Sequence, residues 1–416
     1  MPTAIFVGGA PAVAQVNTET PATVEIGDEF YIRLENHAGE NHEIGFTATA
    51  TTVANVVTGL QAAAAAAKAA GTAPWDEVTC TDDTTVMTIT AVTAGVPFYI
   101  TTRVVNGGAN DTQTLTDANT VACAGPSIFN TPENWDSGSF FADADDIVIR
   151  ADVAALIYGG DYTSGKANKI TAEEGFSQNV GSQAHPLQLA CTGKTDKKVY
   201  WWGTGICYLD IDAAVDIYIF DCGSSADTGL YDLNLVGLDN DSVHFQPSNS
   251  SARCGLASGA GEVFEVAHIY QSDGVLKIGY GAVFTDGAAV ITDCTITGGE
   301  AVSYSTVGIG VIYNQGNGGT LDYMIGPCAT LYAWAGTTRF SSPGNITTKL
   351  HVGSGASFDL SGTKEASTIT ACDAYANSTI EDPGGRASWS AGIVTVGCNA
   401  QNITLVTKPG GTLTPS

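Results

Sequence analysis

Charged residues are scarce in this chain, and basic residues are the scarcest. Asp, Glu, Lys and Arg together make up 14% of the 416 residues, against about 25% in typical globular proteins. Sixteen basic residues stand against 43 acidic ones, which gives a formal net charge of −27. A surface this acidic repels phosphate backbones and anionic membranes, so we expect the protein to bind neither nucleic acid nor membrane.

Long apolar runs and the features of a secretion signal are also missing. No stretch approaches the roughly 18 uninterrupted apolar residues that a membrane-spanning helix needs. The opening MPTAIFVGGAPAVAQV lacks the basic region and the apolar run of a signal peptide. We therefore expect a protein that is made in the cytoplasm without a signal peptide and is released by cell lysis.

Cysteine pairs with metal-type spacing are absent as well. The chain has ten cysteines, and no two of them form a CxxC pair, which excludes zinc ribbons and thioredoxin-like motifs. Several of them, including Cys207, Cys222 and Cys294, fall inside apolar strand-like runs. We expect these cysteines to be reduced and to serve as small buried hydrophobic side chains.

What is abundant favours β structure with many turns: 44% of the residues are hydrophobic and 49 are glycine. Residues 1–122 predict a small α+β anchoring domain with the order β-β-α-β-β. Its first two strands are expected in TVEIGDEFYIRLEN and HEIGFTATA. A helix follows in TTVANVVTGLQAAAAAAKAA, because alanine has the highest helix propensity, and Gly71 and Pro74 end it.

Residues 123–198 predict a transition segment that leads into the next domain, with a strand at 146–150. Two acidic stretches in it, WDSG and DADD, suggest a calcium loop. They lack the glycine position and the distal glutamate of an EF-hand. We therefore expect no metal site and no cofactor.

Residues 199–385 predict a right-handed parallel β-helix. Short apolar runs recur there about every ten residues, separated by Gly, Asn, Asp or Ser, with no helix-length periodic segment. Two or three strands per turn fit a solenoid repeat of about 20–30 residues. In LDIDAAVDIYIFDC, Leu209 and Ile211 are expected to point into the coil, with Asp210 and Asp212 outward. Residues 386–416 predict a short β cap with strands in AGIVTVG and NITLVT.

The N-terminal part resembles a domain of tailed-phage and prophage virion proteins. The resemblance lies in PAVAQVNTETPATVEIGDEFYI, FTATATTVANVVTGLQAAAAA and WDEVTCTDDTTVMTITAVTAGVPFYITT. The continuation NWDSGSFFADADDIVIRADVAALIYG resembles the segment that leads into a β-helix in such proteins. The resemblance covers roughly residues 8–160, and it carries no catalytic motif.

The resemblance implies a non-enzymatic structural role on the virion. We expect a capsid decoration or head-fibre protein that forms a homo-oligomer, most simply a trimer, and contacts the major capsid protein or other virion proteins. Two alternatives stay open: a tail fibre or spike that binds host glycans, and a β-helical polysaccharide-degrading enzyme. The resemblance does not decide between the head and the tail.

The residues favour the non-enzymatic interpretation over the enzyme. Asp210, Asp212, Asp216 and Asp221 offer carboxylate pairs of the kind that glycosidases use, but an acidic ladder on a solvated wall explains them equally well. None of the six histidines lies next to a G-x-S-x-G elbow. His244 and His268 lie in strand-like runs, which favours ordinary hydrogen-bonded histidines. We therefore assign no catalytic, cofactor-binding or metal-binding residue.

Two aromatic clusters stand out as candidate contact residues. VYWWGTG supplies Trp201 and Trp202, and YAWAG supplies Tyr332 and Trp334. Such rings can stack on sugar rings, fill the interior of a β-helix turn, or be buried in an interface, where tryptophan and tyrosine are favoured. The sequence leaves these three roles open.

Overall fold

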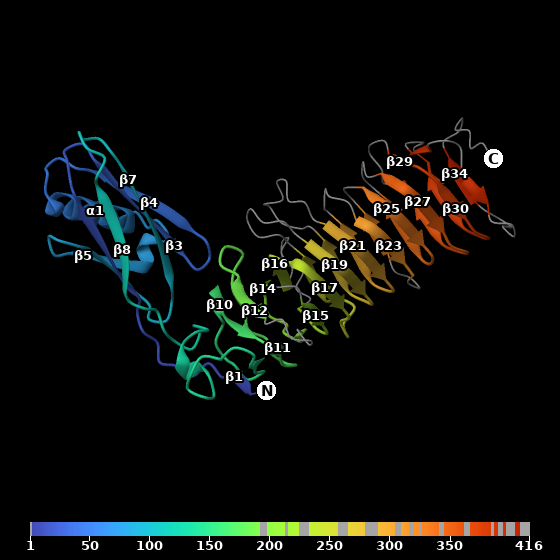
Figure 1. The fold of residues 1–416 in the computed structure, drawn as a ribbon, viewed down its shortest axis with the longest axis horizontal. Coiled ribbons are helices and arrows are strands. Elements are labelled where there is room, and N and C mark those ends of the chain that lie inside the picture. The colour runs from blue at the N-terminus through green and yellow to red at the C-terminus, as the bar shows by residue number, and fades with distance from the viewer. Residues whose placement is uncertain are drawn as a thin grey trace.

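The computed structural model describes residues 2–191, 198–212, 215–223, 233–256, 265–278, 290–303, 309–315, 320–323, 327–340, 345–361, 367–383, 387–389, 394–396 and 404–407. It confirms the predicted fold class: a small N-terminal α+β domain joined to a long parallel β-solenoid (Figure 1). No helix in these ranges is long and apolar enough to cross a membrane.

The N-terminal domain consists of two antiparallel sheets and one helix. One sheet has the order β5-β6-β2-β8 and the other β4-β3-β7. The strands are β2 (Val16–Ala22), β3 (Glu29–Asn36), β4 (Asn41–Thr47), β5 (Val78–Asp82), β6 (Met87–Ala91), β7 (Phe98–Val105) and β8 (Thr114–Val121). The helix α1 (Val53–Ala69) contacts strands of both sheets. A single turn of 3-10 helix, η1 (Trp75–Glu77), precedes β5.

The helix prediction is confirmed, and its ends have clear causes. The hydroxyl of Thr52 accepts a hydrogen bond from the backbone N–H of Asn55, which satisfies a donor that the first turn leaves unpaired. Gly71 follows the last turn at a φ of 66°, the left-handed conformation that favours glycine. Val56, Val57 and Leu60 are buried and anchor the helix in the domain core.

The strand order of this domain is longer than the predicted β-β-α-β-β. The strand β2 precedes the two expected strands, and four strands rather than two follow the helix. The sequence concealed β2 because its buried positions include Asn17 and Glu19, so VNTETPA shows no alternation of apolar and polar residues.

The solenoid is made of two parallel sheets whose strands alternate along the chain. The large sheet contains β1 (Thr3–Phe6), β9 (Asp146–Ile149), β11 (Lys169–Ala172), β13 (Lys198–Trp201), β15 (Asp216–Ile219), β17 (Asp239–Phe245), β19 (Glu265–Gln271), β21 (Val290–Ile296), β23 (Ile309–Asn314), β25 (Cys328–Ala333), β27 (Ile346–Val352), β29 (Ser367–Ile369), β30 (Cys372–Ala374), β32 (Ala387–Trp389) and β33 (Val394–Val396). We call each strand level of this sheet a rung.

The second sheet contains β10 (Gly160–Ala167), β12 (Leu187–Cys191), β14 (Cys207–Asp212), β16 (Leu233–Val236), β18 (Arg253–Leu256), β20 (Val275–Ile278), β22 (Glu300–Ser303), β24 (Thr320–Tyr323), β26 (Thr337–Phe340), β28 (Ser357–Asp359), β31 (Thr379–Asp382) and β34 (Thr404–Thr407). Most strands pair in parallel with the strand two places further along the chain, as β13 does with β15. This connectivity stacks each turn of the coil on the one before it.

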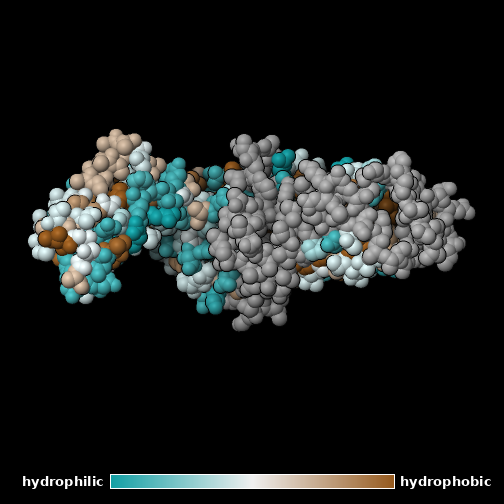
Figure 2. Space-filling view, turned by 90° about the horizontal axis from the view of Figure 1, so that it is seen from above, coloured by the Kyte–Doolittle hydropathy of each residue, from teal (hydrophilic) through white to brown (hydrophobic). Residues whose placement is uncertain are grey.

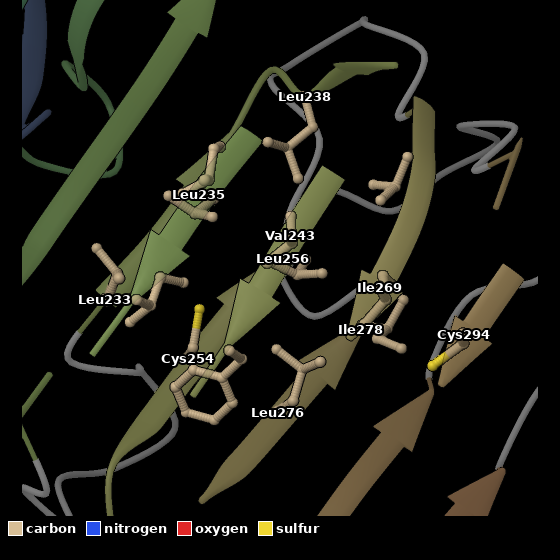
Figure 3. Packing of buried hydrophobic residues seen from close by; sticks show 14 of the residues in the cluster. Leu233, Leu235, Leu238, Val243, Cys254, Leu256, Ile269, Leu276, Ile278 and Cys294 are labelled. Carbon is tan, nitrogen blue, oxygen red and sulfur yellow. The ribbon is translucent and has the colours of Figure 1, made fainter. Parts of the chain in front are cut away.

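The core of the solenoid lies between the two sheets. Figure 3 shows Leu256, Ile269 and Ile278 pointing into this space from strands of both sheets. Leu209 and Ile211 are buried as predicted, whereas Asp210 is partly exposed and Asp212 is exposed. Alternate residues of each strand therefore build one continuous apolar core along the coil.

The cysteine prediction is confirmed for the described core positions. Cys207, Cys222 and Cys294 are buried in the solenoid. Burial raises the pKa of the Cys294 thiol to about 12 and raises the pKa of Cys254 well above its usual value. These two thiols are not joined in a disulfide and stay protonated at neutral pH.

The solenoid starts earlier than the predicted boundary at residue 199. Its ladder begins with β9, so most of the predicted transition segment forms the first turns of the coil. The strand β1 also belongs to the solenoid, because it pairs in parallel with β9 across some 140 residues of chain (Figure 1). At the other end, β33 and β34 confirm the two strands predicted after residue 386, and they extend the same two sheets.

An aromatic cluster closes the first turn of the coil. Phe6, Phe129 and Trp135 pack against one another with ring centroids 5.1–5.5 Å apart. The indole N–H of Trp135 donates to the backbone oxygen of Phe129 at 2.9 Å. Trp135 follows η2 (Pro132–Asn134) and bridges Phe6, so this segment covers the edge of β1.

The N-terminal domain contacts the solenoid through a small polar and aromatic joint. The ring of His185 stacks on Tyr99 with a centroid distance of 3.7 Å, and its Nε2 lies 3.0 Å from Glu35. The Tyr99 hydroxyl donates to the backbone oxygen of Gly159 at 3.3 Å. Figure 2 shows that the surface of the N-terminal domain mixes hydrophilic and hydrophobic residues, in keeping with the low charge content.

Candidate functional site: an aromatic wall on the large sheet

The outer face of the large sheet carries a column of aromatic side chains. In seven strands the outward residue between two inward residues is tyrosine or histidine. They are Tyr200, Tyr218, His244, Tyr270, Tyr313, Tyr332 and His351. All seven stand in register in the strand pairing, with Thr295 in the same column between Tyr270 and Tyr313. We call this set the aromatic column.

The first part of the column is a stack of parallel rings. Tyr200 and Tyr218 have centroids 5.4 Å apart and an interplanar angle of 20°. Tyr218 and His244 are 4.4 Å apart at 7°, and Tyr270 follows His244 at 6.3 Å with a tilt of 42°. Strands in a sheet are about 4.8 Å apart, so rings at one register position reach stacking distance.

A second aromatic pair lies beside this stack, two residues further along each strand. Trp202 and Phe220 stack with centroids 4.6 Å apart at 21°. Trp202 also lies beside Tyr200, 6.2 Å away and inclined by 22°, and Phe220 lies in the same way beside Tyr218. Each of these two rungs thus carries two rings side by side, and the two pairs stack on each other. The first stack is the name we give to Tyr200, Trp202, Tyr218, Phe220 and His244.

The second part of the column repeats the arrangement beyond Thr295. Tyr313 and Tyr332 are 4.8 Å apart at 4°, and Tyr332 and His351 are 4.5 Å apart at 8°. Trp334 lies beside Tyr332 and also reaches Tyr375, with centroids 5.6 Å apart in both cases. Trp334 and Tyr375 are each 37% exposed. We call this group the second stack.

Acidic side chains along the aromatic column pair with side chains of neighbouring strands. Lys169 lies 3.3 Å from Asp146 and Lys349 lies 2.7 Å from Asp373. The ring of His268 is hydrogen-bonded to Asp293 at 2.7 Å. Two of the basic residues beside the column are therefore paired with carboxylates, on a chain that carries −27 as a whole.

The two histidines of the column are favoured in their neutral form. Burial lowers the pKa of His244, and the nearby Asp216 opposes that effect. Burial likewise lowers the pKa of His351, against the opposing effect of Asp373. A neutral imidazole stacks on a tyrosine ring, as His244 does on Tyr218 and His351 on Tyr332, without the cost of burying a charge.

The structure separates the four aromatic residues that the sequence singled out. Trp202, Tyr332 and Trp334 lie on the outer wall, in the first and second stacks. Trp201 is only 1% exposed and points into the coil, where its indole N–H donates to the backbone oxygen of Gly203 at 3.1 Å. The strand alternation that exposes Trp202 buries Trp201, so Trp201 fills the interior and is not a surface contact residue.

The acidic residues weighed as catalytic candidates fall into separate local interactions. Asp210 lies on the second sheet and accepts a hydrogen bond from Gln188 at 2.9 Å, whereas Asp216 starts a strand of the large sheet. Asp221 accepts a hydrogen bond from the backbone N–H of Cys222 at 2.9 Å. The predicted hydrogen-bonded histidine is found at His268, whereas His244 stacks between rings.

The acidic stretch DADD shapes a turn. Asp143 accepts a hydrogen bond from the backbone N–H of Lys166, and Asp145 accepts one from Ala142. Across the ranges that the structure describes, no group of three or more His, Cys, Asp or Glu side chains is placed to hold a metal ion.

Five of the seven residues of the aromatic column had no role in the sequence interpretation. Their signal is a short pattern of an apolar residue, then tyrosine or histidine, then a buried residue. It recurs as VYW, IYI, VHF, IYQ, IYN, LYA and LHV. Aligning the strand-like runs on this pattern rather than on their spacing would have predicted the column.

Comparison with known proteins adds no identity: no family model, no curated protein and no solved structure matches this chain.

Proposed function

We propose that this chain is a non-enzymatic structural protein of a tailed-phage particle that decorates or stabilises the capsid surface. The observation that carries the proposal is a solenoid that buries its own apolar side chains and keeps an ordered aromatic wall outside. The N-terminal resemblance implies the same order of domains, a small α+β unit followed by a β-helix. Such a rod can fold without a partner and still present one continuous contact surface.

Charge favours the aromatic wall as the place where copies of the chain meet. Two surfaces that share the −27 of this chain repel each other, and ion pairs on the wall reduce that repulsion there. Tyrosine and tryptophan are also enriched in protein interfaces. A trimer with closed symmetry would pair these walls, and many such contacts over a shell would add up to firm attachment.

The acidic residues support a structural role over an enzymatic one. Asp210, Asp221 and Asp293 serve hydrogen bonds or ion pairs within and between turns of the coil. A glycosidase instead needs two carboxyl groups that face each other across the scissile bond. We expect no release of reducing ends when the full chain is incubated with polysaccharides of the host envelope.

The direct test is the composition of purified particles. We expect the chain to co-sediment with particles on a density gradient, in a copy number of the same order as the main shell protein. The shell protein and an abundant host enzyme serve as positive and negative controls for quantitative mass spectrometry. A chain that stays wholly in the soluble fraction, or that releases reducing ends, would contradict the proposal.

A second candidate function is a tail fibre or spike that binds host glycans. The aromatic wall favours it, because aromatic rings with neighbouring polar groups form carbohydrate sites as readily as protein interfaces. The same experiment separates the two candidates. A tail fibre is present in a few copies per particle, whereas a decoration protein is present in numbers near those of the shell protein.

A further inference from the structure

The first stack ends abruptly on the side that faces the start of the solenoid. The column position of Tyr200 is held by Thr171, Val148 and Ile5 in the three preceding rungs. These side chains are short and β-branched, and all three are only partly exposed. The outward side chains of the column therefore change from short β-branched residues to an aromatic ring between β11 and β13. We call Ile5, Val148 and Thr171 the floor, and we call the place where Tyr200 and Trp202 follow it the aromatic step.

The step is where the faces of the rings are available. Inside the stack, Tyr218 is covered on both faces, by Tyr200 and by His244. Tyr200 and Trp202 are covered on one side by Tyr218 and Phe220. On their other side the preceding rung places Thr171 and Glu173, and no aromatic residue in the described ranges stacks there.

The two rings of the step form one surface. Tyr200 and Trp202 lie side by side, 6.2 Å apart between centroids and inclined by only 22°. This spacing is comparable with that of two linked pyranose rings. The apolar C–H faces of such sugar rings pack on aromatic faces, whereas ring edges give them little area. A disaccharide unit therefore matches the two side-by-side rings of the step.

Polar side chains flank the floor on both sides. Lys169, which pairs with Asp146 at 3.3 Å, lies on one side and is followed by Lys198. Arg150 and Glu173 lie on the other side. Arg150 pairs with Asp152 at 2.7 Å, and Glu173 accepts a hydrogen bond from the backbone N–H of Ala151 at 3.1 Å. Such groups offer donors and acceptors to sugar hydroxyls.

The balance of these charges indicates the kind of ligand. Three basic and three acidic groups surround the floor: Lys169, Lys198, Arg150, Asp146, Asp152 and Glu173. These six charges cancel one another, on a chain that carries −27. An uncharged ligand meets neither an attractive nor a repulsive field at the step, whereas an anionic polymer is repelled by the chain as a whole.

We propose that the aromatic step binds an uncharged pyranose oligosaccharide, with two successive sugar rings against the faces of Tyr200 and Trp202. The proposal deepens the second candidate function and does not depend on the location of the chain on a particle. A second copy of the chain is the competing occupant. A second copy would pack better on the flat parts of the wall than on the aromatic step.

The test uses the full chain and uncharged trisaccharides of glucose, galactose, mannose and N-acetylglucosamine, with a uronic acid trisaccharide as the charged comparison. Isothermal titration calorimetry should show binding of at least one uncharged probe and weaker binding of the uronic acid. Trp202→Ala should weaken that binding about ten-fold, the effect of losing one stacked aromatic contact. Trp202→Phe should keep calorimetric binding and lose the change in tryptophan fluorescence.

Phe220→Ala is the matched control, because Phe220 lies directly behind Trp202 in the same stack and is shielded from the step. It should leave affinity within about two-fold, since it removes a stacking neighbour and no ligand contact. Thermal unfolding by circular dichroism establishes that both variants are folded. The proposal is overturned if no probe binds, if both variants lose affinity equally, or if Trp202→Ala instead changes the oligomer mass.

The outcome separates this site from the function proposed above. Glycan binding by the purified chain and the copy number of the chain on particles are measured independently, so a failure of the first does not alter the second. A high copy number with glycan binding supports the step and assigns it to a decoration protein. A low copy number without glycan binding contradicts both.

Discussion

The N-terminal domain and the solenoid solve the problem of burying side chains in different ways. The domain encloses one core between α1 and two antiparallel sheets, and every strand of these sheets except β2 contributes apolar side chains to it. The solenoid has a core that runs along its axis, in which each turn packs on the turns beside it. A destabilising substitution should therefore affect the whole N-terminal domain, whereas in the solenoid its effect should stay within the turns near the substituted residue.

The two regions also treat buried polar groups differently. In the solenoid, the side-chain nitrogen of Gln271 donates to the backbone oxygens of Gly274 and Glu300 at 3.0 and 2.9 Å. In the N-terminal domain, both carboxyl oxygens of Glu19 are buried, and burial followed by the neighbouring Asp117 raises its pKa to about 9. The amide of Gln271 thus ties neighbouring turns of the coil together, whereas Glu19 is a buried group of the domain that titrates.

The largest expected effect comes from removing one buried tryptophan from each region. Trp75 and Trp135 are both buried, and both donate an indole N–H to a backbone oxygen. Each change to alanine should lower the free energy of unfolding of its own region by about 3–5 kcal/mol. Hydrogen exchange read by mass spectrometry during urea unfolding reports the two regions separately.

Trp334→Ala is the control for this pair, because its ring lies on the outer wall and is 37% exposed. If Trp75→Ala and Trp135→Ala each unfold the whole chain in a single transition, the two regions are one cooperative unit. The proposed contrast between them would then be wrong.

A smaller effect is expected from the buried carboxyl group of the N-terminal domain. Glu19 is neutral in the fold and ionised in the unfolded chain between its unfolded pKa near 4.5 and its folded pKa of about 9. Its raised pKa therefore favours the fold fully below about pH 4.5, and this contribution is lost as the pH rises. Glu19→Gln should stabilise the domain by roughly 1–3 kcal/mol at pH 8 and by little at pH 4.5.

Urea unfolding of the wild type and Glu19→Gln across pH 4–9 measures this difference. The solenoid signal serves as an internal control, since Glu19 lies outside that region. Parallel stability curves for the two proteins over the whole pH range would show that Glu19 is ionised in the fold.

The aromatic column should contribute less than the core directly beneath it. Tyr218→Ala removes a partly exposed ring from the first stack and should cost about 1 kcal/mol, the energy of an aromatic pair. The neighbouring Ile217 is fully buried, and Ile217→Ala should cost about 2–5 kcal/mol. Equal losses for the two variants would mean that the wall stabilises the coil as much as its core does.

The smallest effect is expected from the ion pairs beside the column. Lys169 and Asp146 are 3.3 Å apart, with partly exposed side chains. Lys169→Ala should lower the free energy of unfolding by less than about 1 kcal/mol, and the difference should shrink in 1 M salt. If the free energy of unfolding falls by more than about 2 kcal/mol and the difference persists in 1 M salt, Lys169 stabilises the fold by more than a solvent-exposed ion pair.

The sequence supported the main outline of the fold for physical reasons. Short runs with alternating residues, such as the one containing Leu209 and Ile211, predict strands with one buried face, and these positions are buried. The alanine-rich helix was likewise predictable from local propensity. These features depend on residues close together in the chain, where period and propensity act directly.

What the sequence concealed depends on contacts far apart in the chain. The strand β1 joins the large sheet by pairing with β9, and its four residues TAIF carry no sign of that partner. The aromatic column joins strands that lie 18–26 residues apart in its first part, so its rings meet only once the register is known. Trp201 and Trp202 show most clearly what the sequence conceals. Successive side chains of a strand point to opposite faces, and only the structure shows which of the two tryptophans points outward.

We propose that this rod is a fixed part of a particle surface. Cryo-electron microscopy of purified particles, with the N-terminal domain labelled by gold-tagged Fab fragments, tests it most directly. We expect gold over the capsid shell at regular sites, with unlabelled rods of matching length in the density maps. Particles that carry no gold on head or tail, in a lysate where the Fab binds soluble chain, would contradict the account.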